Sequence, residues 1–213
     1  MSPSRAQGAR TAGVLDIRRG SERPEDAEGG EKIPSAPEGV GKFRLGLLSD
    51  SHGRAETTRR AASLLVAAGA DALIHLGDVG SVQVLEALVA GREPTGRPCP
   101  PVGLVWGNVD LSPARLEGRC RDLGITVHRG LGRIEAGGKS ALFLHGHEKD
   151  VFGSALSEAP DYLFHGHTHQ TRNDLVNRTR VINPGALFRA ARYTVAIVDL
   201  QSDRVEFIEV SRE

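Results

Sequence analysis

The chain contains 213 residues, and its 27 basic and 27 acidic side chains give a formal net charge of zero. This balance provides no global field that would attract nucleic acid or an anionic membrane. Two cysteines, Cys99 and Cys120, are too few for a disulfide scaffold and lack the spacing of a zinc site.

No apolar run approaches the roughly 18 residues that span a bilayer, and the N-terminal stretch lacks the apolar core of a secretory signal. We therefore expect a cytoplasmic protein with reduced cysteines and no membrane partner. The first 15 residues carry arginine but no acidic residue, which leaves an organelle-targeting segment as the alternative.

The composition changes near residue 42. Residues 1–41 mix both charge signs with Gly, Pro and Ser and contain few residues that could build a core. Such a segment cannot offset the entropy of ordering, so we expect a disordered tail, either without a function or with a docking role. Residues 42–213 are expected to form one folded domain.

In the first half of this domain, short apolar runs alternate with helical segments. We expect strands within 43–50, 71–78, 101–108 and 125–130, and helices over 55–69, 81–91 and 112–124. Ser112 opens the last helix, with Pro113 in its first turn. This alternation predicts an α/β fold with a largely parallel sheet.

The second half is richer in strands. Strands are predicted within 140–147, 162–169, 179–185, 193–200 and 204–210, with one short helix near 153–158. Together the two halves predict a two-sheet α/β sandwich with helices on the outside.

Polar side chains follow five of the predicted strands. Because sites in open α/β sheets form beyond the carboxyl ends of strands, these loops should converge at one edge. The residues are Asp50 and His52, Asp78, Asn108, His145 and His147, and His167 and His169.

Oxygen and imidazole donors without cysteine suit borderline divalent ions such as Mn, Fe, Co, Ni or Zn, rather than a structural zinc. The donors outnumber the needs of one ion, and two ions about 3.5–4 Å apart would use them if one carboxylate bridges the pair. Glycines beside the candidate ligands would let the backbone approach closely; they are Gly77, Gly107, Gly146 and Gly166.

The ordered motifs DSHG, HLGDV, GNVD, LHGH, GHTH and INPGA resemble those of the calcineurin-like metallophosphoesterases. The closer likeness is to their small YfcE-like phosphodiesterases, which are related in fold to the retromer subunit Vps29. The resemblance covers about residues 44–210. It implies a four-layer α-β-β-α sandwich with two mixed sheets and a dinuclear metal site.

The same resemblance implies a ligand set and a reaction. A metal-bound hydroxide would attack a phosphodiester in a small phosphorylated substrate, with manganese as the expected metal and Ni, Co, Fe or Zn as alternatives. One ion would take Asp50, His52, Asp78 and His169, and the other Asp78, Asn108, His145 and His167, with Asp78 as the bridge. The candidate catalytic residues are Asp78, Asn108 and His147.

The sequence allows more than one role for several residues near the predicted site. His147 either contacts the substrate or its surroundings or is a plain loop histidine, and His165 either supports the site or packs. Arg189 and Arg192 either reach a phosphate or are solvated surface residues. His75 is expected in the core, His128 outside the site, and the turn 183–185 beneath it as a support.

One position departs from the wider family. Many members carry histidine after the GN pair, where it is thought to protonate the leaving group, whereas this chain has Val109. Because valine transfers no proton, this position argues against efficient monoester hydrolysis. The YfcE-like branch also tends to lack this histidine, and the resemblance to it implies phosphodiester hydrolysis. Asp110 keeps the acidic position and is expected to cap the helix at 112.

A Vps29-like scaffold that binds proteins without catalysis is the alternative function. Such scaffolds carry substitutions among the motif residues, whereas all predicted ligand positions are intact here, which favours the enzyme. A nuclease is a second alternative, against which the neutral charge and the lack of a basic stripe argue.

Overall fold

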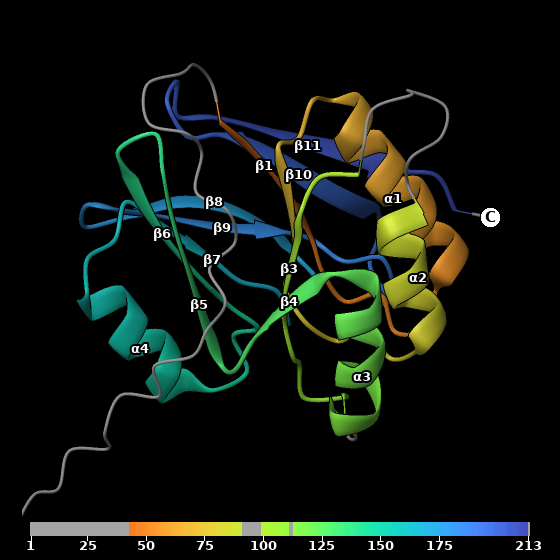
Figure 1. Ribbon diagram of the computed structural model, residues 1–213. Coiled ribbons are helices and arrows are strands. Elements are labelled where there is room, and N and C mark those ends of the chain that lie inside the picture. The colour runs from red at the N-terminus through yellow and green to blue at the C-terminus, as the bar shows by residue number, and fades with distance from the viewer. Residues whose placement is uncertain (1–42, 91–98, 111–112, 213) are drawn as a thin grey trace, which may run out of the picture.

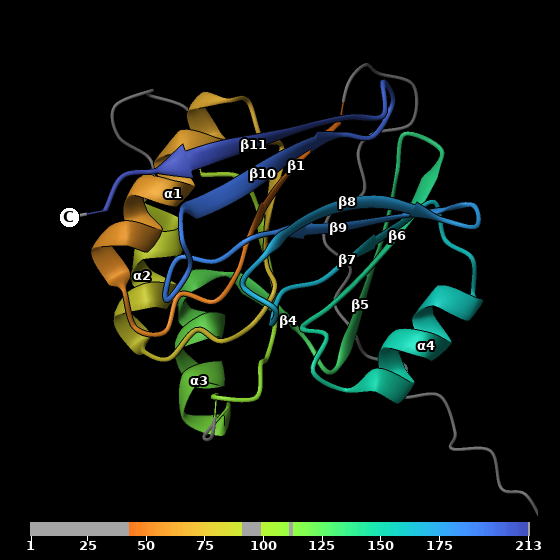
Figure 2. The same cartoon turned by 180° about the vertical axis from the view of Figure 1, so that it is seen from behind.

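The computed structural model describes residues 43–90, 99–110 and 113–212. Two β-sheets pack face to face, with helices covering their outer faces (Figures 1 and 2). This four-layer α-β-β-α arrangement confirms the predicted fold class. The predicted tail 1–41 and the predicted helix opener Ser112 lie outside the described residues.

The first sheet has six strands in the order β11-β10-β1-β2-β3-β4. Strands β1 to β4 are parallel, as predicted, whereas β10 and β11 add an antiparallel edge. The strands are β1 (Arg44–Leu48), β2 (Ala72–His75), β3 (Val102–Val105), β4 (Ile125–His128), β10 (Tyr193–Asp199) and β11 (Arg204–Val210). The helices α1 (Ala55–Ala67), α2 (Val82–Ala90) and α3 (Pro113–Leu123) cover its outer face.

The second sheet has five strands in the order β5-β6-β7-β9-β8, with β6, β7 and β9 parallel to one another. Its outer face is covered by the helix α4 (Lys149–Ser157). The strands are β5 (Leu131–Ala136), β6 (Lys139–Leu144), β7 (Tyr162–Phe164), β8 (Thr171–Val176) and β9 (Thr179–Pro184).

Alternation along β1 shows how one strand serves two hydrophobic layers. Leu45 and Leu47 belong to the core between the sheets, which also includes Phe143 and Phe164. Leu48 points the other way, into the core beneath α1 and α2. Because successive side chains of a strand lie on opposite faces, a strand covered on both sides is apolar over its buried length, as β1 is from Leu45 to Leu48.

Two strands and one helix end differ from the sequence prediction. The strands β5 and β8 were not predicted; both are edge strands, and β8 has mostly exposed polar residues, so it carries no apolar run. The helix α4 begins at Lys149 rather than near residue 153, because Gly153 lies in its middle without breaking it. Among the described helices, none is long and apolar enough to cross a membrane.

Candidate metal centre

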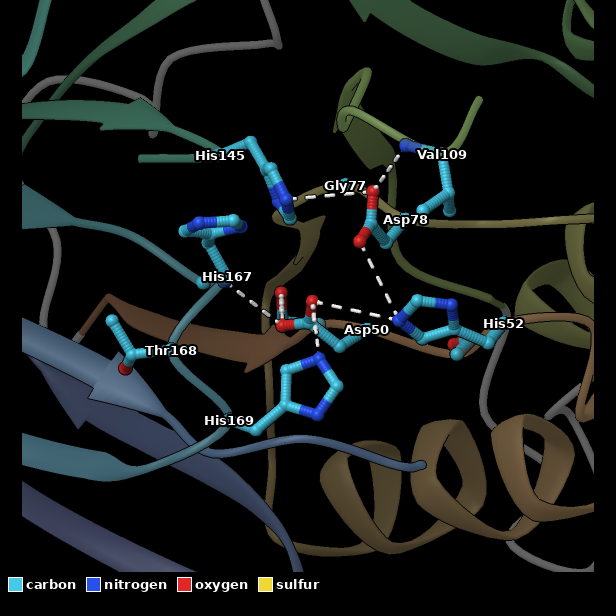
Figure 3. Close-up of polar contacts among 12 residues, drawn as sticks. Asp50, His52, Gly77, Asp78, Val109, His145, His167, Thr168 and His169 are labelled. Atoms are coloured by element: carbon cyan, nitrogen blue, oxygen red, sulfur yellow. Dashed lines mark hydrogen bonds and ion pairs between the residues drawn. The ribbon is translucent and has the colours of Figure 1, made fainter. Parts of the chain in front are cut away.

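The loops that follow β1, β2, β3, β6 and β7 meet at one edge of the sandwich (Figure 3). The sequence prediction that strand-end loops converge is therefore confirmed. Contacts among the candidate ligands connect all of them into one cluster; these ligands are Asp50, His52, Asp78, Asn108, His145, His167 and His169.

Five of these seven residues have a backbone in the left-handed region, which side chains other than glycine rarely adopt. Such conformations cost roughly 1–3 kcal/mol each and gather at functional sites, where the surrounding structure holds them in place. The five have φ values between 44° and 66°: Asp50, His52, Asp78, His167 and His169.

The first group of candidate ligands is Asp50, His52 and His169, whose ligand atoms lie within 4.8 Å of one another. Nε2 of His169 is 3.2 Å from Oδ1 of Asp50. Oδ1 of Asp50 and Nε2 of His52 are buried without a hydrogen-bond partner among the described residues. Burial raises the pKa of Asp50 and lowers that of His52. An unpaired carboxylate oxygen and imidazole nitrogens that converge in this way fit a divalent cation.

The second group contains Asp50, Asp78 and His145. The Nδ1 of His145 contacts the carbonyl oxygen of Leu76 at 2.7 Å, which assigns the ring proton to Nδ1. Nε2 then faces Oδ1 of Asn108 at 3.0 Å and Oδ1 of Asp78 at 3.4 Å. A carbonyl that orients a histidine in this way is typical of support for a metal ligand.

Burial lowers the pKa of His145, but the hydrogen bond and charge of Asp78 outweigh burial, so the pKa is raised overall. This direction indicates that a positive charge is stabilised beside Asp78.

Asp78 belongs to the second group and also contacts His52 of the first. Its Oδ2 is 3.4 Å from Nε2 of His52, whereas its Oδ1 is 3.4 Å from Nε2 of His145 (Figure 3). Burial raises the pKa of Asp78, but the contact with His145 and the hydrogen bond from the Val109 backbone N–H lower it more, to about 2. The carboxylate is therefore ionised and presents one oxygen to each group, as a bridging ligand requires. Asp50, by contrast, is the carboxylate that the two groups share among the described residues.

The turn after β7 separates its two candidate ligands. His169 lies with Asp50 and His52, whereas the ring of His167 lies 5.1 Å from the ring of His145. His167 is outside both compact groups, and its backbone N–H donates to Oδ2 of Asp50 at 3.1 Å. The two histidines therefore lie on different sides of the cluster, and their assignment to two ions stays a prediction.

His147 lies at the open side of the cluster. Its exposed ring is 5.3 Å from the ring of His145 and 6.1 Å from that of His167, and Nε2 is 3.9 Å from Oε1 of Glu148. This position makes it a candidate for contact with a substrate.

The turn 183–185 supports the site, as predicted. The Nδ2 of Asn183 donates to the carbonyl oxygen of Gly166 at 2.8 Å and to Oγ1 of Thr168 at 3.1 Å. Gly166 itself allows a close approach, since a Cβ atom there would lie 1.9 Å from Oγ of Ser49. His165 is 4 % exposed and packs edge-on against Phe152, which favours packing as its role.

Asp110 has a role that the sequence did not predict. It is buried and accepts hydrogen bonds from the backbone N–H groups of Val79, Gly80 and Gly107, at 2.9–3.2 Å. It therefore ties the loop after β2 to the loop after β3. The residue 112 that it was expected to cap lies outside the described residues.

His75 is buried, as predicted, and it joins a hydrogen-bonded chain behind the site. Its Nδ1 accepts the N–H of Gly77 at 3.2 Å, so its Nε2–H donates to Oγ of Ser51 at 2.9 Å. Oγ of Ser51 is 3.0 Å from Oγ1 of Thr58, which donates to the carbonyl oxygen of Arg54 at 2.8 Å. Burial lowers the pKa of His75 to about 3, so the ring is neutral.

Comparisons with known proteins agree with this geometry. The chain is similar to the phosphodiesterase MJ0936 of Methanocaldococcus jannaschii, with 25% identity over 178 residues, covering 80% of this chain and 100% of the relative. A solved archaeal phosphodiesterase superposes with a TM-score of 0.70 at 22% identity, covering 79% of this chain and 100% of that chain.

The fold is also similar to that of YfcE, a phosphoesterase of E. coli, with a TM-score of 0.55, 19% identity and coverage of 79% of this chain and 100% of that chain. Residues 43–203 match the calcineurin-like phosphoesterase superfamily domain. Together with the Asp and His groups at the strand ends, this match identifies the chain as a member of the calcineurin-like phosphoesterase superfamily.

Proposed function

We propose that the protein is a dinuclear metal-dependent phosphodiesterase. The observation that carries this proposal is the position of Asp78, whose two oxygens face the imidazoles of His52 and His145 at 3.4 Å each. A carboxylate placed between two groups of donors suits a pair of cations better than one cation.

The proposed cofactor is a pair of divalent ions, with manganese first and Ni, Co, Fe or Zn as alternatives, because the donors mix carboxylate, carboxamide and imidazole. Asp50, His52, Asp78 and His169 would hold one ion, and Asp78, Asn108, His145 and His167 the other. When bound, the ions would supply an activated water and neutralise charge on the phosphoryl oxygens.

The chain's own residues would hold the metal ligands in place and contact the substrate. Leu76 orients the His145 ring through its carbonyl oxygen, and Asp110 fixes the loops that carry Asp78 and Asn108. His147 is exposed beside His145 and is proposed to contact a phosphoryl or leaving-group oxygen of the substrate.

The expected preference for activated leaving groups rests on Val109. Its side chain is 38 % exposed beside the centre and offers no proton to a leaving oxygen. Good leaving groups need little protonation, whereas an alkoxide needs a general acid whether it leaves a monoester or a diester. The choice of diesters as the substrate class is supported by the similarity to phosphodiesterase MJ0936.

A Vps29-like binding scaffold remains the alternative, and the chain's fold is similar to Vps29 of Entamoeba histolytica at a TM-score of 0.51 and 13% identity. The intact donor set favours the enzyme, because a scaffold has no need to hold ligand backbones in left-handed conformations.

The test is hydrolysis of bis(p-nitrophenyl) phosphate by full-length protein, first stripped with a chelator and then supplied with Mn²⁺. We expect no turnover after stripping and recovery on addition of Mn²⁺. Asp78→Asn should not recover, whereas Asp174→Asn, a matched change at an exposed carboxylate of β8, should recover fully. A folded protein that hydrolyses no phosphodiester with any of the five metals would support the scaffold.

A further inference from the structure

The Phe188 ring lies against the candidate metal centre. Its centroid is 4.9 Å from the centroid of the His52 ring. Phe188 follows the buried residues Ala186 and Leu187, and the N–H of Leu187 donates to the carbonyl oxygen of Ser49 at 3.3 Å. Because this backbone bond joins the segment to the end of β1, the position of Phe188 relative to the centre is fixed.

Two guanidinium groups lie against this ring. The Cζ of Arg54 is 5.2 Å from the ring centroid, and that of Arg189 is 5.0 Å from it. Both arginines are exposed, and neither has a carboxylate partner in the part of the chain that the structure describes. Stacking on an aromatic ring restrains a guanidinium while its N–H donors stay free for an anion.

A contribution to folding stability does not explain why Arg54 and Arg189 lie against the same ring. Two like charges near one ring repel each other, and stacking at an exposed site offsets this repulsion only weakly. Arg189 also has a φ of 46°, in the left-handed region. A bound anion that accepts hydrogen bonds from these guanidiniums would lessen the repulsion and give both side chains a function.

A groove beside the metal centre includes Arg189 in its lining. It has a volume of about 580 Å³ and is lined by residues 168–171, residues 189–192 and Thr194. His169, a candidate ligand of the first ion, lies at its metal end. Arg192 also lines the groove, but its guanidinium is 3.7 Å from the carboxylate of Glu209.

We propose that Arg54 and Arg189 bind a second phosphate group, carried on one arm of the phosphodiester substrate. The inference rests on the proposed function and names its substrate class. The scissile phosphate would lie at the metal ions, and the arm would follow the groove past His169 to Arg189. A terminal phosphate carries up to two negative charges, and its oxygens match the paired N–H donors of a guanidinium.

The test uses two esters that differ by one phosphate. They are the p-nitrophenyl ester of thymidine 5′-phosphate and the same ester with an added 3′-phosphate. We expect the metal-loaded protein to have the higher kcat/KM for the 3′-phosphorylated ester. Arg54→Gln and Arg189→Gln should each lower the ratio of the two kcat/KM values roughly tenfold, mainly through KM, since a charge-assisted hydrogen bond supplies about that much.

Arg178→Gln is the matched control. Arg178 is exposed in the turn between β8 and β9, at the end of the hairpin far from the residues 171 and 184 that border the site. The same loss of charge there should leave the ratio unchanged.

A second readout is binding itself, measured by calorimetry with thymidine 3′,5′-bisphosphate and thymidine 5′-phosphate. The two arginine variants should lose affinity selectively for the bisphosphate. Equal losses for both nucleotides, or a native protein without preference for the bisphosphate, would overturn the subsite while leaving the phosphodiesterase intact. Arginine-dependent binding of the bisphosphate without cleavage of either ester would support the subsite and reject the proposed function.

Discussion

The backbone N–H of Val109 donates a hydrogen bond to Oδ1 of Asp78 at 3.0 Å. Val109, whose side chain cannot transfer a proton, therefore still positions the carboxylate that faces both donor groups. Any residue except proline could make this bond, so the side chain at this position is free to vary without loss of the loop geometry.

Val109→His should accordingly preserve the geometry of the site and add a general acid. We expect turnover of alkyl phosphoesters to rise about tenfold while turnover of activated aryl diesters stays within twofold, because only a poor leaving group needs a proton. We expect only this modest gain in alkyl ester turnover because Asp110 already accepts three backbone hydrogen bonds. It is therefore not available to orient the new histidine ring.

The measurement for this variant is kcat/KM across a matched series of aryl and alkyl leaving groups. The dependence on leaving-group pKa should become flatter than in the native protein. Parallel slopes, together with fast monoester hydrolysis by the native protein, would identify another proton donor, with His147 as the first candidate.

Replacing Asp78 should lower turnover far more than replacing His147. Asp78→Ala removes the oxygens that face both groups and should lower kcat by at least about 10³-fold, whereas His147→Ala should cost about 10–100-fold, as expected for a substrate contact. Initial rates under saturating Mn²⁺ distinguish the two. An inactive His147 variant beside an Asp78 variant with most of its turnover would reverse the assignment.

Gly107 should tolerate no side chain. A Cβ atom there would lie 2.0 Å from Oδ1 of Asp78 and 2.4 Å from its backbone nitrogen. Gly107→Ala should therefore displace Asp78, abolish activity and cost about 1–3 kcal/mol of stability by overpacking.

Gly118→Ala is the control for this change. Gly118 lies in α3 with nothing within 4 Å of the added Cβ atom, so alanine should stabilise the helix by roughly 0.5–1 kcal/mol and leave activity unchanged. Urea unfolding and turnover of both variants test the pair. An active Gly107→Ala protein would contradict the close packing of the two loops.

His75 should make folding stability depend on pH. Burial lowers its pKa from 6.5 to about 3 in the folded state, whereas in the unfolded chain it titrates near the ordinary value. Its contribution is therefore fully present above pH 6.5 and is lost progressively as the pH falls toward 3, because the unfolded state binds the proton first.

The measurement is urea unfolding in the presence of a chelator at pH 7.5 and 5.0, for the native protein and His75→Gln. The native protein should lose about 2 kcal/mol more than the variant between these two pH values. An equal pH dependence in both proteins would show that the His75 ring titrates normally when folded.

Much of the fold could be predicted from the sequence because its strands are buried on both faces. The runs around β1, β2 and β3 are mostly apolar, and their order with the helices allows few topologies. The edge strand β8 escaped prediction because its residues are polar and mostly exposed, so that its pairing with β9 depends on the neighbouring strand rather than on its own pattern.

The candidate ligands were also visible in the sequence, since they follow strands whose carboxyl ends meet. The residues that support or surround these ligands could not be predicted. Asp110 reads as a helix cap until the folded loops bring the N–H groups of Val79 and Gly80 to it, and Arg54 lies far from Phe188 in the chain. Contacts of this kind depend on the packing of distant loops, which no local pattern records.

The central claim is that Asp78 joins two ions, and the most direct measurement is Mn²⁺ binding followed by electron paramagnetic resonance. The native protein should bind two ions per chain and give the spectrum of an exchange-coupled pair. Asp78→Asn should lose the coupling, whereas the control Asp174→Asn should retain it. A native protein that binds no more than one ion, or an Asp78→Asn protein with the coupling intact, would contradict the account.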